Sequence, residues 1–236
     1  MFDAATEWQR AFVLHQRPYQ DNKVIVTLFT EQNGKVSLIA RKKQSKTSSK
    51  YFTVLQPFVP LLVTYRLKSN ASLGTLLKCE SGSNSFCFEN ERLFSALYLN
   101  ELLMRLLLPG EKMLQLYATY EKSLHELASE ELFDIALRKF EKELLIALGY
   151  GIDLKKTADS LDIMNGDSYD YRFGTGFTRN LVGDGEFGGE ILLNLAADNY
   201  GDLETRRSAK KLFSAILKRL LGDQPLKSRE LFKTSL

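Results

Sequence analysis

Residues 23–40 read KVIVTLFTEQNGKVSLIA. Two apolar, β-branched runs, Lys23–Thr30 and Lys35–Ala40, flank four residues that are typical of a tight turn. Asn33 and Gly34 tolerate the positive φ angle that a short hairpin loop requires. The stretch therefore predicts two antiparallel strands that are neighbours in a sheet.

Further β-rich runs lie on both sides of this hairpin, at Gln9–His15, Val54–Tyr65 and Ser72–Cys79. Pro57 and Pro60 cannot donate to a strand ladder, so the run that contains them is expected to lie at a sheet edge or to bend. Five short strands in about 80 residues form a small barrel or sandwich, and a five-stranded oligonucleotide-binding (OB) barrel is the most economical choice. We therefore predict an OB domain over residues 1–80.

The hydrophobic period changes to that of helices near residue 90. Helices are predicted at Glu91–Leu108, Met113–Ala128, Phe133–Leu148, Gly189–Asn199 and Leu203–Leu221. Residues 151–190 lose the helical pattern, and Tyr169–Phe173 is predicted to pair with Gly176–Thr178 as a hairpin. The predicted fold class is therefore α+β, with a mainly helical domain over residues 81–236 that includes a small hairpin insertion.

The charge of the chain is unevenly distributed. Its 236 residues carry 32 Lys and Arg against 29 Asp and Glu, a formal net charge of +3, but residues 32–79 hold nine bases and no acid. Such a stretch cannot neutralise its own field, so a neighbouring segment or an external polyanion must do so. Nucleic acid is the obvious external polyanion, and the alternative is a solvated basic face that serves solubility.

The densest basic segment follows the third predicted strand. Its five cations are Arg41, Lys42, Lys43, Lys46 and Lys50, with Ser and Thr between them. Cations on flexible stems displace counterions from phosphates without identifying a base, so this segment is a candidate nucleic-acid-binding loop. Tyr51 and Phe52 follow it; aromatic rings at this point either stack on unpaired bases or fill the barrel core, and we expect the core for Phe52.

A second basic array lies on the predicted helix Leu203–Leu221. Arg206, Arg207, Lys210 and Lys211 form like-charge pairs four residues apart, and Lys218 and Arg219 follow on the same helix. Repulsion of this kind indicates an anionic partner, so the first four are candidate nucleic-acid-binding residues. The alternative is a solvated outer face that the acidic middle helices balance.

Catalytic and cofactor motifs are absent from the sequence. Nothing reads GxxxxGK[ST], and Gly174-Thr175-Gly176 lacks the third glycine and the following helix of a dinucleotide-binding fingerprint. His15 and His125 share no spacing with a carboxylate or a cysteine, and Cys79 and Cys87 lie eight positions apart without a nearby histidine. We therefore predict no catalytic residue, no metal site and no cofactor, and a protein that is not an enzyme.

The start of the chain, MFDAATEWQR, carries acids where a signal peptide has a basic region and an apolar core. No apolar run reaches the roughly 18 residues of a membrane-spanning helix. The two cysteines are too few for a disulfide scaffold and are expected to be reduced. We therefore expect a cytoplasmic protein with no membrane partner.

Several segments in order along the chain resemble the RecO family of bacterial DNA repair and recombination mediator proteins. The matching strings are WQRAFVLH at 8–15 with Arg17-Pro18, LFTE at 28–31 with Gly34, LQPF at 55–58, LYLNELL at 97–103, LRKFE at 137–141, LGYG at 148–151 and PLKSRELF at 225–232. Each string alone is weak, but together they cover nearly all of the chain.

This resemblance implies an N-terminal OB barrel joined to a helical C-terminal domain, and a non-enzymatic activity. Members bind single- and double-stranded DNA, anneal complementary strands and, with the partner RecR, help to load the recombinase onto DNA coated by single-strand-binding protein. On DNA, such a protein would be associated with the nucleoid. Many members carry a four-cysteine zinc motif after the Gly-Tyr-Gly segment, but residues 151–190 contain no cysteine here, so zinc is not carried over.

The resemblance also implies contact with the acidic, apolar C-terminal tail of single-strand-binding protein. Such a receptor needs an apolar pocket rimmed by cations, and Arg138 and Lys139 beside Leu137 and Phe140 fit it in outline. Arg138 is the expected carboxylate partner, although an intrahelical pair with Glu141 explains it equally well. The alternative function is that of a protein-interaction adaptor, which binds acidic partner tails and contacts DNA only incidentally.

Overall fold

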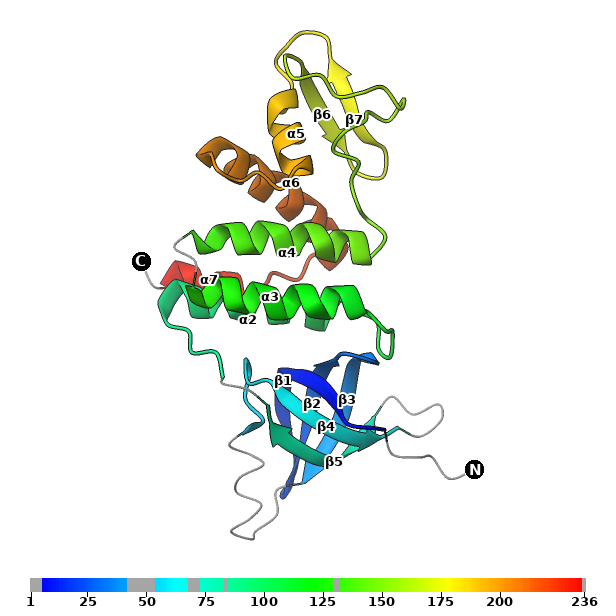
Figure 1. Ribbon diagram of the computed structural model, residues 1–236, viewed down its shortest axis with the longest axis vertical. Helices are drawn as coiled ribbons and strands as arrows, with labels where there is room; N and C mark the ends of the chain where they lie inside the picture. Colours follow the sequence, from blue (N-terminus) through cyan, green and yellow to red (C-terminus); the bar gives the residue numbers. More distant parts are fainter. Residues whose placement is uncertain (1–5, 42–53, 68–72, 83–84, 130–131, 235–236) are drawn as a thin grey trace. The chain divides into compact units, whose positions relative to one another are not determined.

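The computed structural model describes residues 6–41, 54–67, 73–82, 85–129 and 132–234 (Figure 1). The chain forms two compact units, residues 1–130 with 225–236, and residues 131–224. These units are defined by compactness and not by the change from strands to helices. The predicted boundary between an OB domain and a helical domain at residue 80 therefore stays a prediction.

The first unit contains the predicted five-stranded barrel, which is closed in the strand order β1-β2-β3-β5-β4. The strands are β1 (Gln9–Gln20), β2 (Lys23–Thr30), β3 (Gly34–Arg41), β4 (Leu61–Arg66) and β5 (Gly74–Ser81). Neighbouring strands pair antiparallel except β3 and β5, which pair parallel through Leu38 and Ile39. Closure leaves no free sheet edge among these strands.

The predicted hairpin at residues 23–40 is confirmed, with β2 and β3 paired from Lys23 opposite Arg41 to Thr30 opposite Gly34. Gly34 has a φ of +56°, and a Cβ added there would lie 1.9 Å from the main-chain oxygen of Glu111. Only glycine therefore fits, both because of the left-handed conformation and because another segment passes against it.

The fourth strand begins later than predicted. The sequence predicted a strand over Val54–Tyr65, whereas β4 starts at Leu61, after both prolines. Pro57 makes only an isolated bridge to Val13, and Phe58 has a φ of +66°. Of the two predicted possibilities for this run, the structure shows the bend.

The barrel interior is filled by alternate residues of the strands because successive side chains of a strand point to opposite faces. Its buried members are Ala11, Val13, Val24, Val26, Leu28, Val36, Leu38, Ala40, Leu55, Leu61, Val63, Tyr65 and Cys79. The opposite faces of β1 and β2 present Phe12 and Phe29, which are also fully buried. These two rings pack on tyrosines of helix α3 (Leu114–Ser129), so the outside of the barrel also makes an apolar contact.

Two of the predicted helices belong to this unit, α2 (Asn90–Leu106) and α3 (Leu114–Ser129). Tyr117 and Tyr120 of α3 lie against Phe12 at ring-centroid distances of 5.8 and 5.3 Å. The Tyr120 hydroxyl donates to the side chain of Asn100 at 2.5 Å, and the Asn100 amide donates to the Val13 carbonyl at 3.2 Å. A buried polar chain thus joins both helices to β1 without leaving these groups unpaired.

A third helix of this unit, α7 (Lys227–Thr234), was not predicted. It packs against α2, and Leu226 just before it is buried. Eight residues are too few to form a stable helix alone, so its existence depends on this contact.

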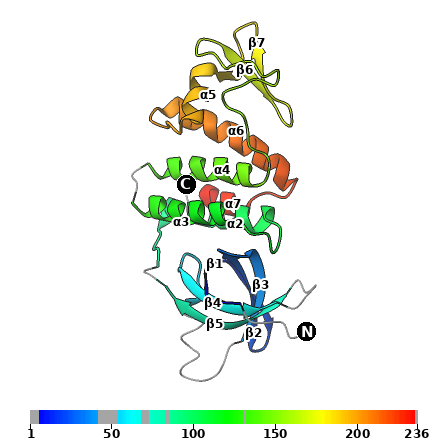
Figure 2. The same cartoon turned by 45° about the vertical axis from the view of Figure 1, so that its right-hand side comes forward.

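The second unit contains α4 (Phe133–Ala147), α5 (Gly189–Ala196), α6 (Leu203–Leu221) and a three-stranded sheet (Figure 2). The sheet has the order β7-β6-β8, from β6 (Ser168–Arg172), β7 (Gly176–Asn180) and β8 (Phe187–Gly188). The predicted hairpin is confirmed as β6 and β7, and β8 adds a short strand that was not predicted. Helix α6 packs against both α4 and α5.

None of the helices in the described part of the chain is long and apolar enough to cross a membrane.

Candidate nucleic-acid interface

The predicted basic loop falls almost entirely outside the described residues. Arg41 is the last residue of β3, pairs in register with Lys23, and is exposed. Lys42, Lys43, Lys46 and Lys50 lie outside the described residues, as do Tyr51 and Phe52.

Four of the nine cations in the acid-free stretch are described, and they differ in accessibility. Arg41, Arg66 and Lys78 are exposed. Lys35 instead donates from Nζ to the Met104 carbonyl at 2.7 Å, and burial lowers its pKa. Lys35 therefore joins the barrel to the last turn of α2, where cations and helix carbonyls attract one another.

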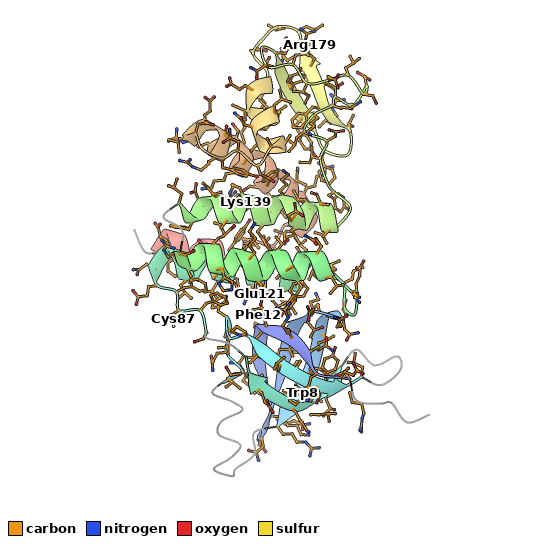
Figure 3. The ribbon with its side chains drawn as sticks, viewed as in Figure 1. Trp8, Phe12, Cys87, Glu121, Lys139 and Arg179 are labelled. Carbon is orange, nitrogen blue, oxygen red and sulfur yellow. The ribbon has the colours of Figure 1, made fainter. Side chains whose placement is uncertain are left out.

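A nearby cation outside that stretch, Arg10, forms ion pairs with two carboxylates of the same unit. Arg10 on β1 lies 2.8 Å from Glu31 and 2.9 Å from Glu121 on α3, with its guanidinium 5.4 Å from the centre of the Tyr117 ring. The hydrogen bond to Glu31 raises the pKa of Arg10, although burial opposes the shift. Figure 3 labels Phe12 and Glu121 at this junction of β1 and α3. The Arg10 side chain is 46% exposed, but its charge is balanced by two carboxylates of the first unit.

Helix α6 carries the second predicted basic array. The helix begins at its N-cap Asp202, whose side chain accepts a hydrogen bond from the Thr205 amide at 2.8 Å. It ends at Gly222, which has a φ of +70°. One face is apolar and buried, through Ala209, Leu212, Phe213, Ile216 and Leu217. Burial of that face directs the basic side chains of the opposite face to the surface.

Arg206 differs from the rest of the predicted array. Its side chain is 12% exposed and forms an ion pair of 3.3 Å with Asp134 on α4. Its Nη1 also donates to the carbonyls of Tyr200 and Gly201 at 2.9 and 3.0 Å. Arg206 thus holds the segment between α5 and α6, and its side chain is not part of the solvated outer face that was the alternative for this array.

The remaining cations of α6 are exposed, and we call them the α6 basic face: Arg207, Lys210, Lys211, Lys218 and Arg219. Lys211 lies 2.9 Å from Glu186, in a pair whose side chains are 57% and 42% exposed. Within the described part of the chain, no carboxylate lies within 4.0 Å of the charged groups of Arg207, Lys210 or Lys218. At a helical rise of 1.5 Å per residue the face spans about 18 Å, enough to follow several successive phosphates.

The predicted tail-binding pair lies on α4. Arg138 is 5% exposed, and its Nη1 lies 2.7 Å from an oxygen of Glu141, which is fully buried. The structure thus shows the intrahelical pair that the sequence left open as an alternative. Lys139, labelled in Figure 3, is half-buried and is the more accessible of the two.

One cluster of the second unit was not identified as a site from the sequence. Tyr150 is 46% exposed and stacks on Phe173, with ring centroids 5.9 Å apart and planes 28° apart. The guanidinium carbon of Arg219 lies 4.9 Å from the centre of the Phe173 ring. The sequence feature that could have indicated this cluster is a tyrosine between two glycines, Gly149 and Gly151. Glycines have no side chains that could cover the ring.

The residues that can hold a metal are dispersed in the structure. The described parts of the chain contain no group of three His, Cys, Asp or Glu side chains arranged to bind an ion. His125 packs edge-on against Phe86 at 4.7 Å, and His15 is exposed on β1. Burial raises the pKa of the Cys79 thiol to about 12, and the charge of Glu80 adds to the shift, so this thiol is inert at neutral pH.

Comparison with known proteins covers both parts of the chain. The family description "Recombination protein O N terminal" matches residues 4–84, and "Recombination protein O C terminal" matches residues 88–230. A "DNA repair protein RecO" of Haemophilus influenzae is 41% identical over 229 residues, which is 96% of each chain. Proteins of that name from Actinobacillus succinogenes and Serratia proteamaculans are 39% and 41% identical, covering 97% and 96% of this chain and 96% and 93% of their own.

Proposed function

This chain belongs to the RecO family of DNA repair proteins, and from that premise we propose that it is a DNA-binding recombination mediator that anneals complementary single strands. In this proposal it binds single- and double-stranded DNA and, with RecR, helps to load the recombinase onto DNA coated by single-strand-binding protein. In this proposal the protein acts by binding DNA and its partners, and it catalyses no reaction.

The observation that carries the proposal is the α6 basic face. Arg207, Lys210 and Lys218 are exposed, and in the described residues no carboxylate neutralises them. Exposed cations without a carboxylate partner release counterions from phosphates when they bind DNA, and this contribution to the binding free energy is independent of the base sequence. Contacts to the backbone leave the base edges free, so two strands held with reduced repulsion are able to pair.

The barrel supplies the second proposed contact. The exposed Arg41 ends β3 at the point where the predicted loop begins, and Lys42, Lys43, Lys46 and Lys50 follow in the sequence. An OB barrel of this topology binds oligonucleotides in other proteins. We therefore assign phosphate contacts to this loop as well.

The proposed partners follow from the family. Contact with the C-terminal tail of single-strand-binding protein is assigned to α4, where Lys139 is the more accessible cation and Arg138 is engaged by Glu141. RecR is proposed as the second protein partner. If instead the protein is an adaptor, it will bind acidic tails directly and bind DNA only when the partner is present.

The proposal is tested by titrating a single-stranded oligo(dT) with the full chain at several salt concentrations. The variant Arg207→Ala/Lys210→Ala/Lys218→Ala should weaken binding and lower the slope of log K against log salt by about 2, since each lost phosphate contact on a single strand contributes about 0.7. A second variant with Ala at Arg41, Lys42, Lys43, Lys46 and Lys50 tests the barrel loop in the same titration.

A matched control replaces Lys112 and Lys122, which are exposed in the first unit, by Ala. Unchanged affinity and an unchanged salt slope in both test variants would reject the proposal. Binding that appears only when a partner protein is added would favour the adaptor.

A further inference from the structure

The exposed ring of Tyr150 is held in place by the end of helix α4. Gly149 has a φ of +80°, its amide donates to the Ile146 carbonyl at 3.0 Å, and the Tyr150 amide donates to the Leu145 carbonyl at 2.8 Å. These bonds end the helix as a C-cap does. The main chain of Tyr150 is therefore fixed, while its side chain is 46% exposed.

The ring does not stand alone. Phe173, at the turn between β6 and β7, stacks on Tyr150 at 28° with centroids 5.9 Å apart. Arg219 of α6 contacts Phe173 at 4.9 Å in a cation–π arrangement. Tyr150 at the end of α4, Phe173 in the turn between β6 and β7, and Arg219 on α6 thus form one group of two rings and a guanidinium within the second unit.

A hollow adjoins these rings. Its volume is about 250 Å³, and its lining includes Tyr150, Phe173, Tyr171, Lys156 and Asp153. Pockets for drug-sized ligands occupy roughly 300–1,000 Å³, so this hollow suits one planar ring better than a folded ligand.

The charges around the hollow favour a nucleobase over an acidic peptide. Lys156 lines it and Arg219 belongs to the α6 basic face, so phosphates of a strand that enters the hollow meet cations. The Asp153 carboxylate on the lining already accepts from the amides of Lys155 and Lys156, at 2.9 and 3.0 Å. A carboxylate there repels the acids of a peptide tail but accepts from the amino and imino groups of a base edge.

We propose that Tyr150, supported by Phe173 and Arg219, is a nucleobase-stacking site for single-stranded DNA in the second unit. This site rests on the proposed DNA-binding function and adds a contact to bases to the phosphate contacts of the α6 basic face. Any base can stack on an aromatic ring, so the site is compatible with annealing of strands of any sequence.

The experiment compares the binding of oligo(dT) with that of an abasic oligonucleotide of the same length. The two strands have the same number of phosphates, but the abasic strand has no bases. The full chain should bind oligo(dT) more tightly. Tyr150→Leu should reduce the affinity for oligo(dT) about tenfold, the size of one stacking contact, and leave binding of the abasic strand and the salt slope unchanged. Tyr150→Phe keeps the ring and should behave as the original chain.

The matched control is Tyr19→Leu, which removes another exposed tyrosine, 39% exposed on β1. A second readout uses the single tryptophan of the chain: in Trp8→Phe/Tyr150→Trp the only indole lies at the site, and oligo(dT) but not the abasic strand should quench its emission.

The outcomes separate the two proposals. If the original chain binds neither strand in a salt-dependent way, the proposed function fails and this site fails with it. If both strands bind equally, or if Tyr150→Leu keeps the preference for oligo(dT), the function stands and the stacking site is rejected. Loss of binding to an acidic peptide ending in Phe, with DNA binding unchanged in Tyr150→Leu, would also overturn the assignment.

Discussion

The carboxylate of Glu101 on α2 accepts hydrogen bonds from both the amide and the hydroxyl of Ser228, at 2.9 and 2.7 Å, although the two residues are 127 positions apart. It also accepts from the Lys227 amide at 2.9 Å. These are the first amides of α7, which have no partner within the helix, so Glu101 caps this helix from another element. Burial raises the pKa of Glu101, but the hydrogen bonds from Ser228 and Lys227 outweigh it and lower the pKa overall.

Replacement of this cap should destabilise the first unit. Glu101→Gln keeps the shape but removes the charge and one acceptor, so at least one amide of α7 loses its partner. We expect a loss of about 1–2 kcal/mol in the free energy of unfolding, measured by urea denaturation at pH 7. Glu91→Gln, at an exposed position of the same helix, is the control and should change stability by less than about 0.5 kcal/mol.

The same cap predicts a pH dependence. Because the pKa of Glu101 is lower in the folded state than its ordinary 4.5, its contribution is fully present above about pH 4.5 and is lost as the pH falls through the folded value. The stability difference between the original chain and Glu101→Gln should therefore be constant from pH 5 to 7 and shrink below pH 4. A difference that persists undiminished at pH 3 would contradict the assignment of the shift to this carboxylate.

Alanine substitutions at two glycines distinguish two contributions to the loss of stability, the strain of a positive φ angle and a clash with a neighbouring segment. Gly34 and Gly110 both have positive φ, +56° and +78°, but a Cβ at Gly110 meets nothing within 4 Å, whereas one at Gly34 meets the Glu111 carbonyl. Gly110→Ala should cost about 1–2 kcal/mol, the penalty of the left-handed conformation. Gly34→Ala should cost distinctly more, because the segment at Glu111 must also move; equal urea midpoints for the two variants would argue against this contact.

Arg138 and Lys139 of α4 are predicted to differ in their roles, because Arg138 is buried and paired with Glu141 whereas Lys139 is half-buried. Arg138→Ala leaves the buried carboxylate of Glu141 without this partner, so it should cost about 3 kcal/mol or more. Lys139→Ala should leave thermal unfolding nearly unchanged and weaken binding of an acidic peptide that ends in Phe. If Lys139→Ala binds that peptide normally, α4 is not the tail site.

The local sequence pattern was sufficient to predict an element when the residues that stabilise it are close to it in the sequence. The β2–β3 hairpin was predicted because its alternating residues and its turn are contiguous, and α6 because its apolar stripe repeats over five turns. Helix α7 could not be predicted in this way, because its first amides are bonded to Glu101 and its apolar contact is with α2.

The same distinction applies to the candidate interface. From the sequence, Arg206 and Arg207 were equivalent candidates for phosphate contact, and Arg138 was preferred over Lys139 as the carboxylate partner. In the structure Arg206 meets Asp134 and two carbonyls, whereas Arg207 is exposed.

The sequence by itself determined the barrel, the helical second half and the positions of the basic segments, because these follow from periodicity and charge along the chain. The tertiary structure decided which cations are engaged inside the protein and which face solvent, and it placed Tyr150, Phe173 and Arg219 together. The reason is that pairing and stacking depend on groups brought together by folding from distant positions, which no local pattern records.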